Sequence, residues 1–119
     1  MLNIFVSPAR KDGGQLEIRI SNSGFYLVVK TSDREYVWKI GSYPRGFSEL
    51  QLRPWPNTCY FHGDLENDLY YIWVAPDEGV PGHVRLYFYD LGGQEFAHVF
   101  IRVTEFNAFC EKFESYWTS

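Results

Sequence analysis

The stretch that decides the fold is EFAHVFIRVTEFNAFCEKFESYW, which runs from Glu95 to Trp117. Its first part, residues 95–103, is rich in β-branched and aromatic residues, which favour strands. From Thr104 onward the apolar residues follow the helical period instead. They form one narrow stripe at 100° per residue, made of Phe106, Phe109, Cys110, Phe113 and Trp117. Thr104 can cap this helix and Glu105 suits its first turn. The change of period predicts a strand followed at once by an amphipathic helix that lies on a sheet.

Upstream of this stretch, turn residues recur every eight to twelve residues, as in β-rich folds. The strands expected between them cover residues 16–20, 25–30, 36–40, 58–62, 69–75, 84–90 and 95–103. Prolines at 44, 54 and 56 interrupt the pattern, so residues 42–57 are expected to form a long loop, or a short helical turn around 47–52. The short gaps between the later strands fit an antiparallel meander.

The fold class that follows is α+β and mostly antiparallel β. The strands are expected to form a β-sandwich or a twisted meander sheet, with the one C-terminal amphipathic helix packed on the sheet. Residues 1–119 have the length of a single globular domain. The strand at 95–103 is apolar on both faces, which predicts that it is covered on both sides, by a sheet on one and by the helix on the other.

The composition, 45% hydrophobic and 22% charged, is that of an ordinary globular protein. Residues 1–6 lack the basic start and long apolar core of a signal peptide, and no apolar run reaches the length of a membrane span. These observations predict a cytoplasmic protein. In that compartment Cys59 and Cys110 are expected to be reduced and buried.

The charge is distributed unevenly along the chain. Residues 1–60 carry eight bases and five acids, a charge of +3, whereas residues 61–119 carry three bases and ten acids, a charge of −7. The two halves sum to the net charge of −4. An acidic half repels nucleic acid and anionic membranes and attracts basic partners. We therefore expect a protein partner, with neither nucleic acid nor membrane.

No metal site or cofactor is predicted. The three histidines, His62, His83 and His98, lie far apart in the sequence and lack zinc-site spacing. Residues 64–68 resemble the start of a calcium loop. However, Leu69 and Ala75 occupy the positions where that loop needs a glycine and a bidentate carboxylate.

The sequence also contains no Gly-x-Ser-x-Gly motif and no glycine-rich phosphate loop before a helix, so we predict that it is not an enzyme. Two alternatives remain open. A small-ligand-binding domain would enclose a pocket lined by Tyr71, Trp73, Tyr87 and Phe100. A small enzyme would place His62 or His98 beside a carboxylate. A lipid-binding module is a weaker alternative, because the first hairpin contains too few basic residues to bind anionic lipids.

Protein binding remains as the main hypothesis. In a meander of the late strands, two acidic turns share one end of the sheet and bring together Asp64, Glu66, Asp68, Asp90 and Glu95. Such a cluster would steer a basic partner toward it. At the opposite end, Trp55 lies between two prolines and is a candidate interface hot spot.

The order of motifs in the second half resembles a known family. Residues 63–65 (GDL) and 82–86 (GHVRL) each lead into a strand, and a final strand runs directly into the helix. Over residues 60–117 this order is similar to small bacterial immunity proteins of WapA-type (wall-associated) polymorphic toxin systems. The resemblance implies a cytosolic protein that binds the toxic C-terminal domain of a secreted toxin. The predicted function is thus an inhibitor that neutralises a cognate toxin by occluding its active surface.

Overall fold

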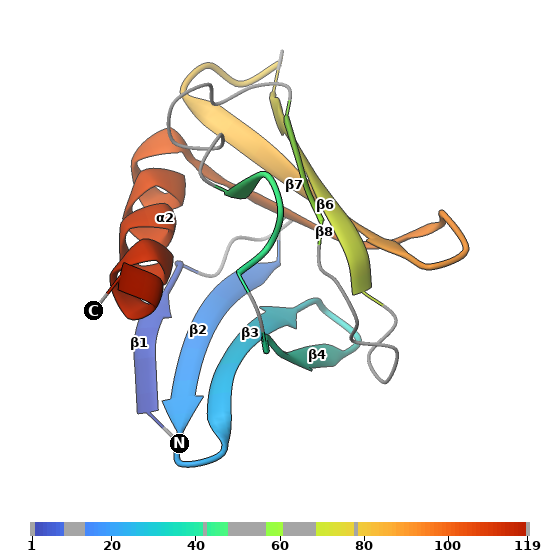
Figure 1. Cartoon of the computed structure of the whole chain (residues 1–119). Coiled ribbons are helices and arrows are strands. Elements are labelled where there is room, and N and C mark those ends of the chain that lie inside the picture. The colour runs from blue at the N-terminus through green and yellow to red at the C-terminus, as the bar shows by residue number, and fades with distance from the viewer. Residues whose placement is uncertain are drawn as a thin grey trace.

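The computed structural model of the chain describes residues 2–8, 14–41, 43–47, 57–60, 69–77 and 79–118. Within these residues the chain forms two four-stranded antiparallel sheets and the C-terminal helix α2 (Val103–Thr118) (Figure 1). The predicted α+β class is therefore confirmed.

The first sheet contains the strands in sequence order, β1 (Leu2–Val6), β2 (Gln15–Ser21), β3 (Gly24–Lys30) and β4 (Glu35–Lys39). The prediction missed β1, because its five residues do not alternate cleanly between apolar and polar. Its pairing with β2 is irregular, with a register shift between Asn3 and Phe5. Tertiary pairing at the edge of the sheet, rather than a local pattern, makes this segment a strand.

The second sheet is the predicted meander of β5 (Asn57–Tyr60), β6 (Leu69–Pro76), β7 (His83–Asp90) and β8 (Glu95–Arg102). Consecutive strands run antiparallel, and Leu69 at the start of β6 pairs with Asp90 at the end of β7. The end of the sheet where β5 finishes and β6 begins is therefore also the end that carries the β7–β8 turn.

The two sheets and α2 share one hydrophobic core. Figure 1 shows the helix lying beside the strands of both sheets. Trp38 of β4 stacks on Phe88 of β7, with ring centroids 5.8 Å apart, and so joins the sheets. Phe113 of α2 stacks on Phe47 at 4.1 Å. The helix stripe predicted from the sequence is buried, as are both cysteines; Trp117, at its end, is half-buried. Burial of this aromatic stripe provides most of the driving force that holds the helix on the sheets.

The predicted start of the helix is wrong by two residues. The Glu105 carboxylate reaches back and accepts a hydrogen bond from the backbone N–H of Arg102 at 2.7 Å. This is the back-reaching half of a capping box, so Arg102 is the N-cap residue and Thr104 lies inside the first turn. The carboxylate satisfies a backbone donor that would otherwise be left without a partner where β8 passes into α2.

The predicted two-sided cover of β8 is also wrong. Its inner residues Ala97, Val99 and Ile101 are buried in the core, and α2 contacts the core from this same side. On the outer side, Phe100 is half-buried by its neighbours: it stacks on His83 at 4.8 Å, and the Arg85 guanidinium lies 4.8 Å from its ring centre. An apolar residue on an outer face can thus be covered by side chains of its own sheet.

The proline-rich region is described only in part. Phe47 is buried in the core, and Arg45 forms a two-way backbone bridge with Tyr60, at 2.9 and 2.8 Å. Beyond Phe47, the helical turn predicted around 47–52 lies outside the described residues. In the described part of the chain, no helix is both long and apolar enough to cross a membrane.

Candidate functional site

The outer side of the second sheet carries a group of aromatic side chains. On β6, Ile72 and Val74 point into the core, while Tyr71 and Trp73 point outward. On β7 the residues alternate in the same way, with Tyr87 and Tyr89 outward. We call the outward group the aromatic face. It consists of Tyr60, Tyr70, Tyr71, Trp73, Tyr87 and Tyr89.

The strand register places these rings beside one another in two rows. In one row Tyr60, Tyr71 and Tyr89 are cross-strand neighbours, and in the next row Trp73 and Tyr87 are followed by His98. Tyr71 and Tyr89 stack with centroids 4.5 Å apart, and Trp73 and Tyr87 stack at 5.4 Å. Pairs of this kind contribute about 0.5–1.5 kcal/mol each beyond the area that they bury, so the rings hold one another in place.

Part of the aromatic face is open to solvent. Trp73 is 37% exposed and Tyr70 is 38% exposed. Between the rings lies a shallow hollow of about 350 Å³, which we call the tyrosine hollow. It is lined by Thr58, Tyr60, Tyr70, Tyr71, Trp73 and Tyr89. A second hollow, of about 500 Å³, adjoins it on the far side of Trp73. It is lined by Trp73, Ala75, Pro76, Asp77, Gly79, Arg85 and Tyr87.

Two carboxylates lie at the β7–β8 end of this face, and they have different roles. Asp90 accepts the backbone N–H of Gln94 on its Oδ1 at 3.0 Å and thereby holds the turn. Glu95 is in register with Tyr89, and its side chain is 40% exposed. Burial raises the pKa of Tyr89, and the neighbouring Tyr71 and Glu95 raise it further. The Glu95 carboxylate also lies 3.6 Å from the His98 Nδ1.

At the opposite end, one carboxylate and one guanidinium of the described residues form an ion pair. Asp77 Oδ2 lies 2.8 Å from the Arg85 Nε, and the other oxygen of this carboxylate accepts the backbone N–H groups of Gly79 and Val80. Burial opposes ionisation of Asp77, but the hydrogen bonds from Gly79, Arg85 and Val80 outweigh it and lower the pKa. The Asp77 carboxylate therefore fixes the start of the β6–β7 connection against Arg85 at this end of the face.

The structure brings together part of the predicted acidic cluster. Asp90 and Glu95 lie at the same end of the sheet. The other predicted binding residues, Asp64, Glu66, Asp68 and Trp55, lie outside the described residues, as does His62. Of the residues proposed for a ligand pocket, Tyr71, Trp73 and Tyr87 line the two open hollows, whereas the Phe100 ring lies beneath Arg85.

The sequence analysis named Tyr71, Trp73 and Tyr87 only as walls of a possible ligand pocket and missed the aromatic face as a protein-binding surface. The signal is nevertheless present in the segments YYIWV, residues 70–74, and LYFYD, residues 86–90. Each alternates an outward aromatic with an inward apolar residue, and register alone brings the two segments together.

Among the described residues, neither His98 nor the cysteines are arranged as a catalytic group would be. His98 Nδ1 is 3.6 Å from Glu95 Oε2, beyond hydrogen-bond distance, and both side chains are about two-fifths exposed. Burial, and then Glu114 and Glu111, raise the pKa of the Cys110 thiol to about 12, and burial also raises that of Cys59. Within the described residues, no three His, Cys, Asp or Glu side chains gather as metal ligands would.

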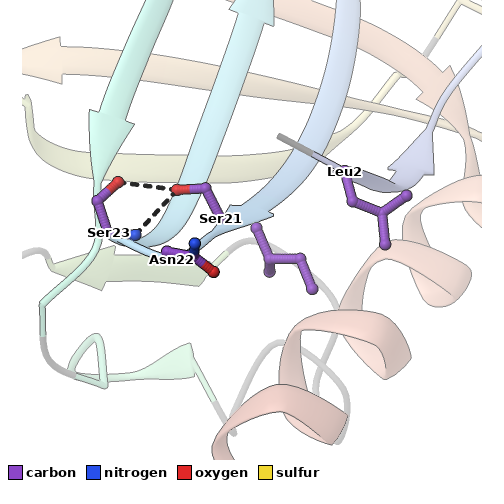
Figure 2. A pocket seen from close by; sticks show the side chains of 5 residues that line it. Leu2, Ser21, Asn22 and Ser23 are labelled. Carbon is purple, nitrogen blue, oxygen red and sulfur yellow. Dashed lines mark hydrogen bonds between the residues drawn. The ribbon is translucent and has the colours of Figure 1, made fainter.

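A further hollow lies at the end of the first sheet. Figure 2 shows its lining, with Leu2 on β1 facing the turn of residues 21–23. The serine groups of this turn already bind one another: Ser23 donates its backbone N–H to Ser21 Oγ at 3.2 Å, and the two hydroxyls are 2.8 Å apart. The described lining includes no aromatic ring, so this hollow lacks the stacked side chains of the aromatic face.

Neither a family model, nor a curated protein sequence, nor a solved structure matches this chain.

Proposed function

We propose that this chain is a protein-binding inhibitor of the immunity type. It attaches the aromatic face of its second sheet to a basic toxin domain and blocks the active surface of that domain, without chemistry of its own. The observation that carries the proposal is the collection of partly exposed, mutually stacked rings on one sheet face.

The kind of side chain on this face supports a protein partner. Tyrosine and tryptophan are enriched in the centres of protein interfaces and among the residues that contribute most to binding. Stacking across the strands restrains the rings before a partner arrives. Binding then costs little side-chain entropy, which favours a tight complex.

The charge of the chain supports a basic partner. Residues 61–119 carry ten acids and three bases, and Glu95 presents its carboxylate beside Tyr89 at one end of the face. Toxin domains that act on nucleic acid are basic where they bind it. A negative potential would therefore speed the encounter and orient the complex.

A second candidate function is binding of a small molecule. It is supported by the hollow in which Trp73 and Tyr87 adjoin the Asp77–Arg85 ion pair. Aromatic walls with a few fixed polar groups are typical of ligand sites. Native mass spectrometry of the purified protein would distinguish this candidate, because a retained ligand adds a discrete mass.

Coexpression tests the proposal directly. The protein is coexpressed with the C-terminal domain encoded by the adjacent upstream gene, and the stoichiometry of the purified complex is measured. We expect a one-to-one complex that the double substitution Trp73→Ala and Tyr87→Ala abolishes. Val37→Ala is the matched control, since Val37 is 38% exposed on the other sheet.

Two results would overturn parts of the proposal. A complex that survives the double substitution would remove the aromatic face from the interface. A folded protein that forms no complex with the neighbouring domain would reject the immunity function.

A further inference from the structure

We propose that the tyrosine hollow receives one arginine side chain of the protein partner. The inference rests on the proposed function, and it specifies the chemical group that the aromatic face recognises. Tyr89, which lines the hollow, is the cross-strand partner of Glu95, whose carboxylate lies near that end of the hollow.

The lining of the tyrosine hollow suits a cation. Four tyrosines and one tryptophan contribute to it, and Thr58 is its remaining described lining residue. The faces of aromatic rings carry negative potential, which attracts cations within about 6 Å of the ring centre. The lining rings also touch one another: Tyr60 and Tyr70 have centroids 5.7 Å apart, and Tyr70 and Tyr71 have centroids 5.5 Å apart. A group entering the hollow would therefore meet several rings at once.

The protein already places guanidinium groups on rings at both ends of this surface. The Arg45 guanidinium lies 4.6 Å from the centre of the Tyr60 ring, which itself lines the hollow. At the other end, the Arg85 guanidinium lies 4.8 Å from the centre of Phe100. The backbone bridge between Arg45 and Tyr60 holds the first of these pairs in place. Guanidinium groups thus approach ring centres of this sheet at cation–π distance.

The local electrostatics favour a positively charged occupant. Glu95 is in register with Tyr89, and its side chain is 40% exposed. Burial is the main cause of the raised pKa of Tyr89, and Glu95 adds to it, so this carboxylate lies close enough to act on a cation at the Tyr89 end of the hollow. The Arg45 guanidinium lies at the opposite, Tyr60 end. The planar, weakly hydrated guanidinium suits a shallow ring-lined hollow better than the compact, strongly hydrated ammonium of lysine.

A titration of the isolated protein tests the inference without the partner. The probes are the blocked tripeptide acetyl-Gly-Arg-Gly-amide and its neutral isostere, in which citrulline replaces arginine. The readout is the nuclear magnetic resonance shift of the Trp73 indole N–H, assigned by its loss in Trp73→Phe. We expect saturable shifts with the arginine peptide and about tenfold weaker binding of the citrulline peptide, the size of one cation–π contact.

Variants locate the binding. Tyr71→Leu removes a lining ring and should weaken arginine-peptide binding, whereas Tyr26→Leu on the outer face of the first sheet should not change it. Equal binding of the two peptides would overturn the inference, as would shifts confined to residues outside the hollow.

The outcome is separable from the test of the proposed function. If the arginine peptide binds but the neighbouring domain does not copurify, the hollow recognises arginine and the immunity function fails. If the complex forms but the two peptides bind equally, the interface stands and the arginine assignment fails.

Discussion

Trp73 and Tyr87 face each other across the β6–β7 register on the outer side of the second sheet, with ring centroids 5.4 Å apart and planes inclined by 30°. The neighbours of each residue along its strand point into the core, so the two rings themselves lie on the outer side of the sheet. The strand register fixes the pair, and its outer surface remains available to a partner.

Substituting Trp73 should weaken partner binding more than it lowers the stability of the fold. Trp73→Ala is expected to weaken partner binding by about 2 kcal/mol or more, as for a central interface tryptophan. Its effect on the free energy of unfolding should be about 1 kcal/mol, because Trp73 is 37% exposed and leaves no core cavity. Calorimetric titration and chemical denaturation measure the two quantities. A loss of binding no larger than that of Val37→Ala would contradict the prediction.

A buried carboxylate on the first sheet provides a test of stability. Glu17 is 1% exposed, and its two oxygens lie 3.1 Å from Arg19 Nη2 and 2.8 Å from Lys30 Nζ. Arg19→Met leaves this carboxylate buried with only Lys30. We expect a loss of about 2 kcal/mol in the free energy of unfolding, below the full cost of an unpaired buried charge because Lys30 remains.

The double substitution Glu17→Leu and Arg19→Met is the control for that experiment. Because it removes the buried charge as well as its partner, it should recover most of the lost stability. If the double variant is less stable than Arg19→Met alone, the carboxylate stabilises the sheet through contacts other than this ion pair.

Asp77 predicts a specific dependence of stability on pH. Burial opposes its ionisation, but hydrogen bonds from Gly79, Arg85 and Val80 lower its pKa below the ordinary value of 3.8. A carboxyl group with a lowered folded-state pKa stabilises the native state above its unfolded pKa, and this contribution is lost as the pH falls through the folded-state pKa. The stability difference between wild type and Asp77→Asn should therefore be largest near neutral pH and shrink below 3.8. Denaturation at a series of pH values measures it, and a difference independent of pH would contradict the assignment.

The start of α2 can be tested by comparing two neighbouring residues. Glu105→Ala removes the acceptor of the Arg102 backbone N–H and should cost about 1 kcal/mol of stability. Thr104→Ala should cost less than about 0.5 kcal/mol, since Thr104 is exposed and lies inside the first turn. Thermal or chemical unfolding of the two variants gives the comparison. A larger loss of stability for Thr104→Ala than for Glu105→Ala would show that Thr104 is the N-cap residue.

The two cysteines should be inert in the native protein. Both are buried, and burial raises the pKa of Cys110 to about 12, so almost no thiolate forms near neutral pH. We expect alkylation by iodoacetamide at pH 8 to proceed at the rate of unfolding and to accelerate with urea. Rapid modification without denaturant would show that one thiol is accessible in the folded protein.

Several elements could be predicted because their signals are local. The stripe from Phe106 to Trp117 repeats with the helical period, and the strands at 16–20 and 84–90 are bounded by turn residues. Strand β1 could not be predicted, since its pairing with β2 is irregular and three of its five residues are exposed. The outer side of β8 misled the prediction because Phe100 is covered by Arg85 and His83, which lie 15 or more residues away along the chain.

By itself, the sequence determined the α+β class, the meander of late strands and the amphipathic helix, because hydrophobic period and turn chemistry act over a few residues. It also determined the acidity of the second half. Only the tertiary structure decided which side of β8 the helix occupies and which cations contact the buried Glu17 carboxylate. It also decided how the outward rings of β5, β6 and β7 contact one another. Those outcomes depend on strand register, which aligns side chains distant in sequence, and no local pattern carries that information.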